Sequence, residues 1–311
     1  MRQYIRSNLG LYSAMNENKI KSQVSERWVE IDDLRVRCLD WNSDGSVPVL
    51  ALHGLASSAH WYDIVCPLMP STFRILAPDQ RGHGQTTQAA SGYDWDTLAK
   101  DMINILDYMG IDKIGVIGHS WGATVAIALA ACYPARITSL TIIDGGFGRS
   151  NSNSDEDWDT IRRTTFPRNV SGTRQEFLDR IRKQLDCCWN AEVERIVQTM
   201  VWEDEFGQMH DILHPDNHIQ VMKAMWERPA SDMWGEVVCP SMIIPAGPLP
   251  VSGHMERFWN KQSRVALASK GLRASRVHWI QETIHDIGYH RPDYLVDVIS
   301  SFLLSNNVQQ A

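Results

Sequence analysis

Short apolar segments alternate with amphipathic ones along the first half of the chain. Four runs rich in apolar residues predict buried strands, at residues 47–52, 73–77, 114–117 and 137–143. Apolar side chains recur at helical spacing over residues 95–109, which end at Gly110, and residues 123–131 predict a second helix. Strands that alternate with helices indicate a parallel sheet with helices on both faces.

The pattern differs on either side of this segment. Two stretches alternate apolar and polar positions and predict a β-hairpin, at residues 26–31 and 34–41. Residues 147–235 are rich in charge, tryptophan and helix formers and contain no buried-strand run, so we expect a mostly helical insertion, a cap. Strand character returns in two short runs, each followed by a predicted helix, at residues 241–245 and 276–280.

These patterns predict three parts. Residues 1–25 form an N-terminal extension, residues 26–146 and 236–311 form the core domain, and residues 147–235 form the cap. A chain of 311 residues is long enough for one large α/β domain with such an insertion.

Composition narrows the class of partner. The net charge is −7 and no basic stripe occurs, which argues against nucleic acid. No apolar run approaches the roughly 20 residues of a membrane span, and the first 25 residues lack an apolar signal core. The six cysteines show neither metal-ligand spacing nor a disulfide framework. We therefore expect a cytoplasmic protein with free thiols and a small-molecule partner; the oligomeric state stays open.

The most informative motif is Gly118-His119-Ser120-Trp121-Gly122. It lies between a predicted strand and a predicted helix, which is the context of a nucleophile elbow. The turn is so tight that only small residues fit two positions before and after the serine. It exposes the serine hydroxyl at the carboxyl edge of the sheet, so Ser120 is the candidate nucleophile.

Three further motifs accompany the elbow in chain order. They are His53-Gly54, the segment from Asp79 to Gly84, and Ile284-His285-Asp286. Over roughly residues 26–305 the chain resembles the α/β-hydrolase superfamily. This resemblance implies a mostly parallel eight-stranded sheet with helices on both faces and an inserted helical cap.

A serine hydroxyl needs a base that takes its proton during attack. Histidine suits this role, because its ordinary pKa of ~6.5 leaves it largely neutral at pH 7. The resemblance implies that the base follows the last strand, which favours His285. His290 is the alternative, but it lies five residues later, at the start of the last helix.

The acid that orients the histidine departs from the usual family pattern. Relatives commonly place it after the strand that follows the cap, but this chain has Gly247-Pro248-Leu249-Pro250 there. Some relatives carry the acid one strand earlier, and that strand ends here at Asp144. We therefore predict Asp144 as the acid. Glu256, another acid, or none are the alternatives.

The resemblance also implies an oxyanion hole of two backbone N–H groups, those of Leu55 and Trp121. Three side chains are candidates for the substrate pocket: His53, Trp61 and Trp226. No dinucleotide fingerprint or P-loop occurs. Three histidines, His210, His214 and His218, have a spacing that suits a metal on a helix, but Pro215 interrupts any helix there. We predict neither a cofactor nor a metal.

Together these residues predict a serine hydrolase that cleaves a carboxylic ester or lactone through an acyl-enzyme. The resemblance implies aspartate at the elbow in haloalkane dehalogenases and epoxide hydrolases, so serine argues against both. A C–C bond hydrolase and a cofactor-free perhydrolase are alternatives with the same nucleophile. The alternative from another class is a small-molecule receptor with little turnover.

Overall fold

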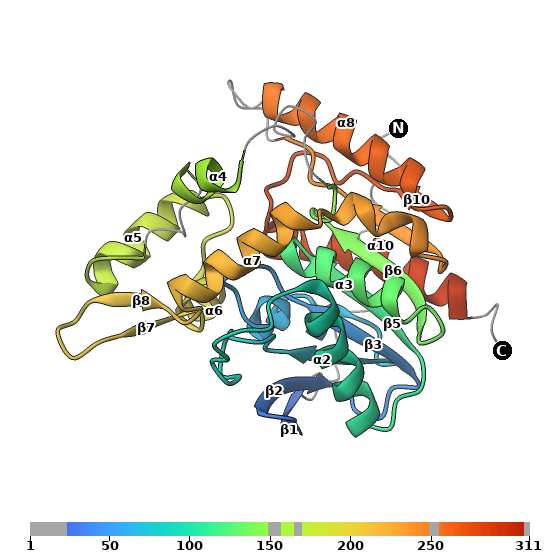
Figure 1. Ribbon diagram of the computed structural model, residues 1–311, viewed down its shortest axis with the longest axis horizontal. Helices are drawn as coiled ribbons and strands as arrows, with labels where there is room; N and C mark the ends of the chain where they lie inside the picture. The colour runs from blue at the N-terminus through green and yellow to red at the C-terminus, as the bar shows by residue number, and fades with distance from the viewer. Residues whose placement is uncertain (1–23, 149–156, 165–169, 249–254, 308–311) are drawn as a thin grey trace, which may run out of the picture.

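A computed structural model describes residues 24–148, 157–164, 170–248 and 255–307. Eight strands form one sheet in the order β1-β2-β4-β3-β5-β6-β9-β10 (Figure 1). The strands are β1 (Val24–Ile31), β2 (Leu34–Trp41), β3 (Val47–Leu52), β4 (Phe73–Pro78), β5 (Ile114–His119), β6 (Ile137–Ile143), β9 (Ser241–Ile244) and β10 (Ser275–Val277). Within this sheet the strands β4, β3, β5, β6, β9 and β10 pair in parallel. Strands β1 and β2 form the predicted antiparallel hairpin, and β2 also pairs antiparallel with β4. The predicted mostly parallel eight-stranded sheet is confirmed.

Helices cover both faces of this sheet because its strands are apolar on both sides. One hydrophobic cluster joins the sheet to α2 (Trp95–Tyr108), α3 (Trp121–Cys132) and α8 (Met255–Gly271). A second cluster joins the opposite face to η1 (Ala59–Asp63), η2 (Cys66–Leu68), α9 (Ile287–His290) and α10 (Pro292–Asn307). The sheet therefore lies between two apolar layers.

The segment between β6 and β9 is mostly helical in its described residues, as predicted for the cap, and also contains one short strand pair that was not predicted. It contains α4 (Trp158–Thr164), α5 (Arg174–Gln184), α6 (Ala191–Gln198), α7 (Pro215–Glu227), η4 (Ala230–Asp232) and η5 (Trp234–Glu236). It also contains an antiparallel pair, β7 (Val201–Glu203) with β8 (Met209–Asp211). The turn of this pair is stabilised by Asp204, whose carboxylate accepts two backbone N–H groups, and by Gly207 at φ 75°. Figure 1 shows α4, α5 and this pair set to one side of the core.

The expected extension at residues 1–25 falls mostly outside the described residues, and Val24 and Ser25 belong to β1. Within the described segments, no helix combines the length and the apolar character needed to cross a membrane.

The turn between β5 and α3 brings backbone segments into close contact. A Cβ on Gly122 would meet the backbone oxygens of His53 and Leu52, and one on Gly118 would meet the carbonyl oxygen of Gly122. Glycine at both positions lets α3 start directly against β3, which is the steric reason for the sequence pattern.

Replacement of Gly122 by alanine should therefore destabilise the fold. We expect Gly122→Ala to lower the free energy of unfolding by about 1–3 kcal/mol, because the new methyl group forces backbone apart in a packed core. Urea unfolding measures the change. The matched control is Gly235→Ala, where a Cβ would enter open space, and we expect little effect. Equal stability of the two variants would contradict this account of the turn.

Candidate active site

Ser120 occupies a strained turn at the carboxyl edge of the sheet. It has φ 55° and ψ −119°, a region that non-glycine residues rarely adopt. Two backbone hydrogen bonds secure it: its N–H donates to Ile143 O over 2.9 Å, and its carbonyl accepts from Ala123 N–H over 3.1 Å. The turn thus holds the hydroxyl at the start of α3, beside the carboxyl ends of the strands, where open α/β sheets bind their ligands.

Two side chains distant in sequence join Ser120. His285 Nε2 lies 2.9 Å from Ser120 Oγ, and His285 Nδ1 lies 2.7 Å from Asp144 Oδ2. Asp144 follows β6, and His285 lies in the loop after β10. The three predicted residues therefore form one hydrogen-bonded chain, serine to imidazole to carboxylate.

Asp144 is buried and surrounded by donors. Its Oδ1 accepts from Ala246 N–H over 2.9 Å and from Lys261 Nζ over 2.7 Å, and Lys261 also contacts Oδ2 over 3.0 Å. Burial opposes ionisation, but the hydrogen bond from His285 and the charge of Lys261 outweigh it, so the pKa of Asp144 falls to about 2. The carboxylate is ionised at any ordinary pH.

His285 is tuned in the opposite direction. Desolvation works against its charged form, yet the hydrogen bond and negative charge of Asp144 prevail and raise the pKa of His285 above its ordinary value. The positive charge of Lys261 works against this increase. The protonated form of His285 is therefore more stable, relative to the neutral form, than that of a free imidazole.

Trp61 was predicted to line the substrate pocket, but it packs instead against the loop that carries His285. Its buried ring stacks on His119 at 4.1 Å between ring centroids, and its Nε1 donates to Asp286 Oδ1 over 2.9 Å. His119 Nε2 in turn lies 3.1 Å from the His285 carbonyl oxygen. Burial lowers the pKa of His119 to about 4, so it stays neutral.

The backbone N–H groups of Leu55 and Trp121 lie at the same cavity as Ser120. Trp121 is the first residue of α3, so its N–H has no partner within that helix. Among the described residues, neither N–H donates to another group. Two residues that line the cavity with Ser120 therefore have backbone N–H groups that no described residue accepts.

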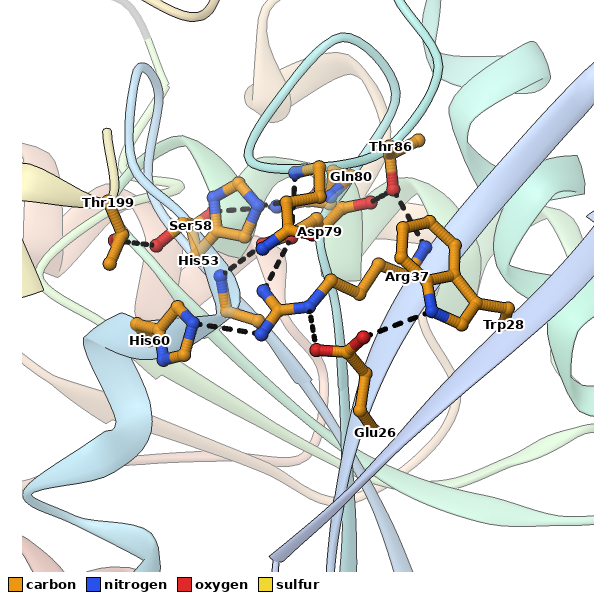
Figure 2. Close-up of polar contacts among 12 residues, drawn as sticks. Glu26, Trp28, Arg37, His53, Ser58, His60, Asp79, Gln80, Thr86 and Thr199 are labelled. Carbon is orange, nitrogen blue, oxygen red and sulfur yellow. Dashed lines mark hydrogen bonds and ion pairs between the residues drawn. The ribbon is translucent and has the colours of Figure 1, made fainter. Parts of the chain in front are cut away.

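Two buried histidines, His53 and His83, hold the loop that contains Leu55. His53 was predicted to line the substrate pocket, but it has this structural role instead. His53 Nε2 accepts from Gln80 N–H over 3.0 Å, and His83 Nε2 accepts from Ala56 N–H over 3.1 Å (Figure 2 shows His53 and Gln80). Burial lowers the pKa of His53 to about 4 and that of His83 to about 3. Both stay neutral, as acceptors of these bonds must.

A buried arginine supports these loops from below. Arg37 of β2 donates through Nη1 to Asp79 Oδ2 over 3.1 Å and through Nε to Glu26 Oε2 over 2.7 Å. Its Nη2 lies 2.9 Å from His60 Nε2 (Figure 2). Asp79 also accepts the Ala59 N–H over 2.7 Å. The Asp79 loop and the start of η1 are thereby tied to the sheet.

A cavity of about 690 Å³ opens over Ser120. Its walls are mostly apolar and come from the core and from α7 of the cap, with Leu55, Phe147, Met222 and Met225 among them. Trp226, a predicted pocket residue, instead lines a separate shallow depression, with its ring 5.9 Å from that of Trp158. Met222 and Met225 of α7 thus line the cavity, whereas Trp226 of the same helix lies against Trp158 of α4.

Comparison with known proteins agrees with this architecture. The family model for the alpha/beta hydrolase fold matches residues 47–200. The thioesterase domain from the curacin biosynthetic pathway aligns with 89% of this chain and 99% of that domain, with a TM-score of 0.70 at 16% sequence identity. The chain belongs to the α/β-hydrolase superfamily.

Relatives in sequence match this chain over part of its length. The soluble epoxide hydrolase of Corynebacterium sp. (strain C12) is 36% identical over 97 residues, which are 31% of this chain and 34% of that protein. The serine hydrolase-like protein of Danio rerio is 30% identical over 106 residues, 33% of this chain and 32% of that protein. The match thus spans about a third of the length of these relatives.

The alternative base and the alternative acid lie outside this hydrogen-bonded chain. His290 is at the end of α9 and bonds through Nδ1 with Thr283 Oγ1 over 3.0 Å. Glu256 lies in the first turn of α8, and its side chain is outside what the structure describes.

The three histidines of the cap do not share a helix face. His210 lies in β8 and bonds with Asp204, His214 precedes α7, and His218 is buried within α7. Pro215 is the first residue of α7, a position where proline is favoured, so no helix runs across it to carry all three histidines. In the described part of the chain, no group of three or more histidine, cysteine or acidic residues could hold a metal ion.

The sequence pattern did not indicate two cations of the candidate site, Lys261 and Arg264 of α8, both of which line the cavity. Their spacing of three residues puts them on one helix face. Nothing in the sequence says that this face meets Asp144, which is 117 positions away from Lys261.

Proposed function

We propose that this chain is a serine hydrolase that cleaves a carboxylic ester or lactone through an acyl-enzyme intermediate. The observation that carries the proposal is the hydrogen-bonded chain from Ser120 through His285 to Asp144. Leu55 and Trp121, whose backbone N–H groups are the candidate donors for the oxyanion, line the same cavity. A nucleophile, its base, the group that orients the base and the donors for the oxyanion are the parts that acyl transfer requires.

The acylation half begins with attack of Ser120 Oγ on the substrate carbonyl carbon. His285 Nε2 takes the hydroxyl proton over the 2.9 Å hydrogen bond as the Oγ–C bond forms. The carbonyl oxygen becomes an oxyanion, which the N–H groups of Leu55 and Trp121 and the N-terminus of α3 stabilise. As the oxyanion collapses, the imidazolium gives its proton to the departing alcohol and an acyl-Ser120 ester is left.

The deacylation half repeats these roles with water as the nucleophile. His285 takes a proton from water as its oxygen attacks the acyl carbon, and the oxyanion forms in the same place. Collapse expels Ser120 Oγ, which recovers its proton from His285, and the carboxylic acid is released. Throughout, Asp144 keeps His285 in the tautomer whose Nε2 is free to accept.

Some relatives are named epoxide hydrolases, so this activity is the second candidate. The chemistry of Ser120 opposes it. A serine hydroxyl that opened an epoxide would form an ether with the substrate. An ether has no carbonyl carbon for water to attack, so the enzyme would stop after one turnover. Attack on an ester or lactone carbonyl instead leaves an acyl group that water can remove.

The test combines rate measurement with covalent labelling of the wild-type protein. We expect turnover of 4-nitrophenyl acetate and butyrate, and rapid labelling by a fluorophosphonate with one adduct, at Ser120 by peptide mass spectrometry. Rapid labelling without ester turnover would point to a C–C bond hydrolase or perhydrolase. Slow or absent labelling would contradict the proposal and favour the receptor.

The pH profile should follow His285. Because protonated imidazole cannot accept the Ser120 proton, kcat/KM should fall as the pH falls through the pKa of His285, with a midpoint above 6.5. Lys261→Met removes a charge that opposes the imidazolium, so its midpoint should lie at higher pH than that of the wild type. Lys270→Met, an exposed cation at the end of the same helix, should leave the midpoint unchanged. A midpoint below 6.5, or a shift to lower pH in Lys261→Met, would contradict this assignment of the base.

A further inference from the structure

Helix α8 presents two cations to the cavity above Ser120. Lys261 and Arg264 lie one turn apart and both line the cavity. The charge of Lys261 is matched, because its Nζ contacts both oxygens of Asp144 at 2.7 and 3.0 Å. Arg264 is thus the cation whose counter-charge has to be found.

No carboxylate within the described segments forms an ion pair with Arg264. Its Nη2 donates to the carbonyl oxygen of Gly148 over 2.6 Å, and its buried Nε has no hydrogen-bond partner. Asp144 is the acid among the cavity-lining residues, and Lys261 and His285 already contact it. An excess of one positive charge therefore lies beside the nucleophile.

Such a guanidinium is costly without a partner. A largely buried cation loses hydration, and an unpaired N–H loses a hydrogen bond as well. Burial accordingly lowers the pKa of Arg264, although the negative charge of Asp144 acts in the opposite direction. An anion bound in the cavity would restore both the charge balance and the missing hydrogen bond.

The rest of the cavity limits the shape of that anion. Phe147, Met222 and Met225 give an apolar surface between Arg264 and the cap. One uncompensated cation matches one negative charge, whereas a phosphate dianion would need more donors. Planar guanidinium groups are well suited to carboxylates.

We propose that Arg264 binds a free carboxylate of the substrate, so that the enzyme prefers esters or lactones with an anionic group on an otherwise apolar acyl or alcohol part. This inference rests on the proposed function, because it requires the reacting carbonyl at Ser120. The distant ion pair would orient the carbonyl toward Ser120 Oγ and raise kcat/KM.

The test uses ester pairs that differ only in charge. The acyl pair is the 4-nitrophenyl monoester of adipic acid and that of adipamic acid. The alcohol pair is 4-carboxyphenyl butyrate and 4-carbamoylphenyl butyrate. Each is measured with the wild type, Arg264→Met, Arg264→Lys and, as the matched control on the same helix, Lys270→Met.

We expect the wild type to prefer the anionic member of at least one pair by tenfold or more, as a charge-assisted hydrogen bond provides. Arg264→Met should abolish this preference, because kcat/KM for the anionic member should fall at least tenfold more than kcat/KM for the neutral member. Arg264→Lys should retain part of the preference, and Lys270→Met all of it. If Arg264 only supports Gly148, its loss should lower kcat/KM for the anionic and the neutral member equally. That result would overturn the inference and leave the esterase proposal intact.

If the wild-type protein cleaves none of these esters, a binding measurement tests the anion site separately. Calorimetric titration compares 3-phenylpropionate with 3-phenylpropanamide, which differ in charge alone. Binding of the acid that is lost in Arg264→Met supports the anion site although the esterase proposal fails. Equal binding of acid and amide, or binding of neither, overturns the anion site.

Discussion

Ser120→Ala should reduce ester hydrolysis by a factor on the order of 10⁴–10⁶. Loss of a serine nucleophile in other hydrolases has effects of this size, because no acyl-enzyme can form. The folded structure should be unchanged, since the Ser120 backbone supplies the bonds to Ile143 and Ala123. Initial rates with 4-nitrophenyl butyrate measure the loss, and thermal unfolding checks the fold.

Ser263→Ala is the matched control for this variant. It makes the same change at an exposed position of α8, and we expect full activity. The fluorophosphonate adduct should be absent in Ser120→Ala and present in the control. If Ser120→Ala kept more than about one hundredth of the wild-type rate, a different nucleophile would have to be sought.

The second large effect is expected for Asp144→Asn, with a loss of about 10²–10⁴ in kcat. Asparagine has nearly the same shape and tolerates the positive φ of 43° at this position. Its amide, however, can donate to His285 Nδ1, which favours the tautomer with a proton on Nε2. That tautomer cannot accept the Ser120 proton. The measurement is kcat, beside the thermal midpoint of unfolding.

Two further variants separate the roles of the acids. Glu256→Gln removes the alternative acid, and we expect it to retain activity. The double variant Asp144→Asn with Lys261→Met removes the cation that the first change leaves without its partner, so it should recover stability and not activity. An Asp144→Asn protein that folds and turns over near the wild-type rate would exclude Asp144 from the mechanism.

The place of the acid has a structural reason. Strands β6 and β9 are neighbours, and the Asp144 N–H donates to Ile244 O at the end of β9 over 2.9 Å. The carboxylate then accepts from Ala246 N–H in the loop after β9. A carboxylate attached to β6 thus reaches His285 across one strand. The proline-rich segment after β9 does not have to supply an acid.

Local sequence pattern predicts an element well when residues that are close in the chain determine its structure. The apolar runs of β3, β5 and β6, the hairpin of β1 and β2, and the tight turn at Ser120 depend on side chains next to each other in the chain. The cap was predicted less well. Its β7–β8 pair depends on a short turn around Asp204 and Gly207, and three-residue strands give no periodic signal.

The sequence by itself determined the fold class and singled out Ser120, His285 and Asp144, because motif order along an α/β chain also orders the loops at one sheet edge. Only the tertiary structure decided what fills the space around them. It turned Trp61 and His53 into supports and Trp226 away from the cavity, and it brought Lys261 to Asp144 and Arg264 to the cavity wall. The reason is distance along the chain: Asp144 and His285 are 141 positions apart, and Asp144 and Lys261 are 117. Contacts of that range depend on how whole layers pack, which local pattern does not encode.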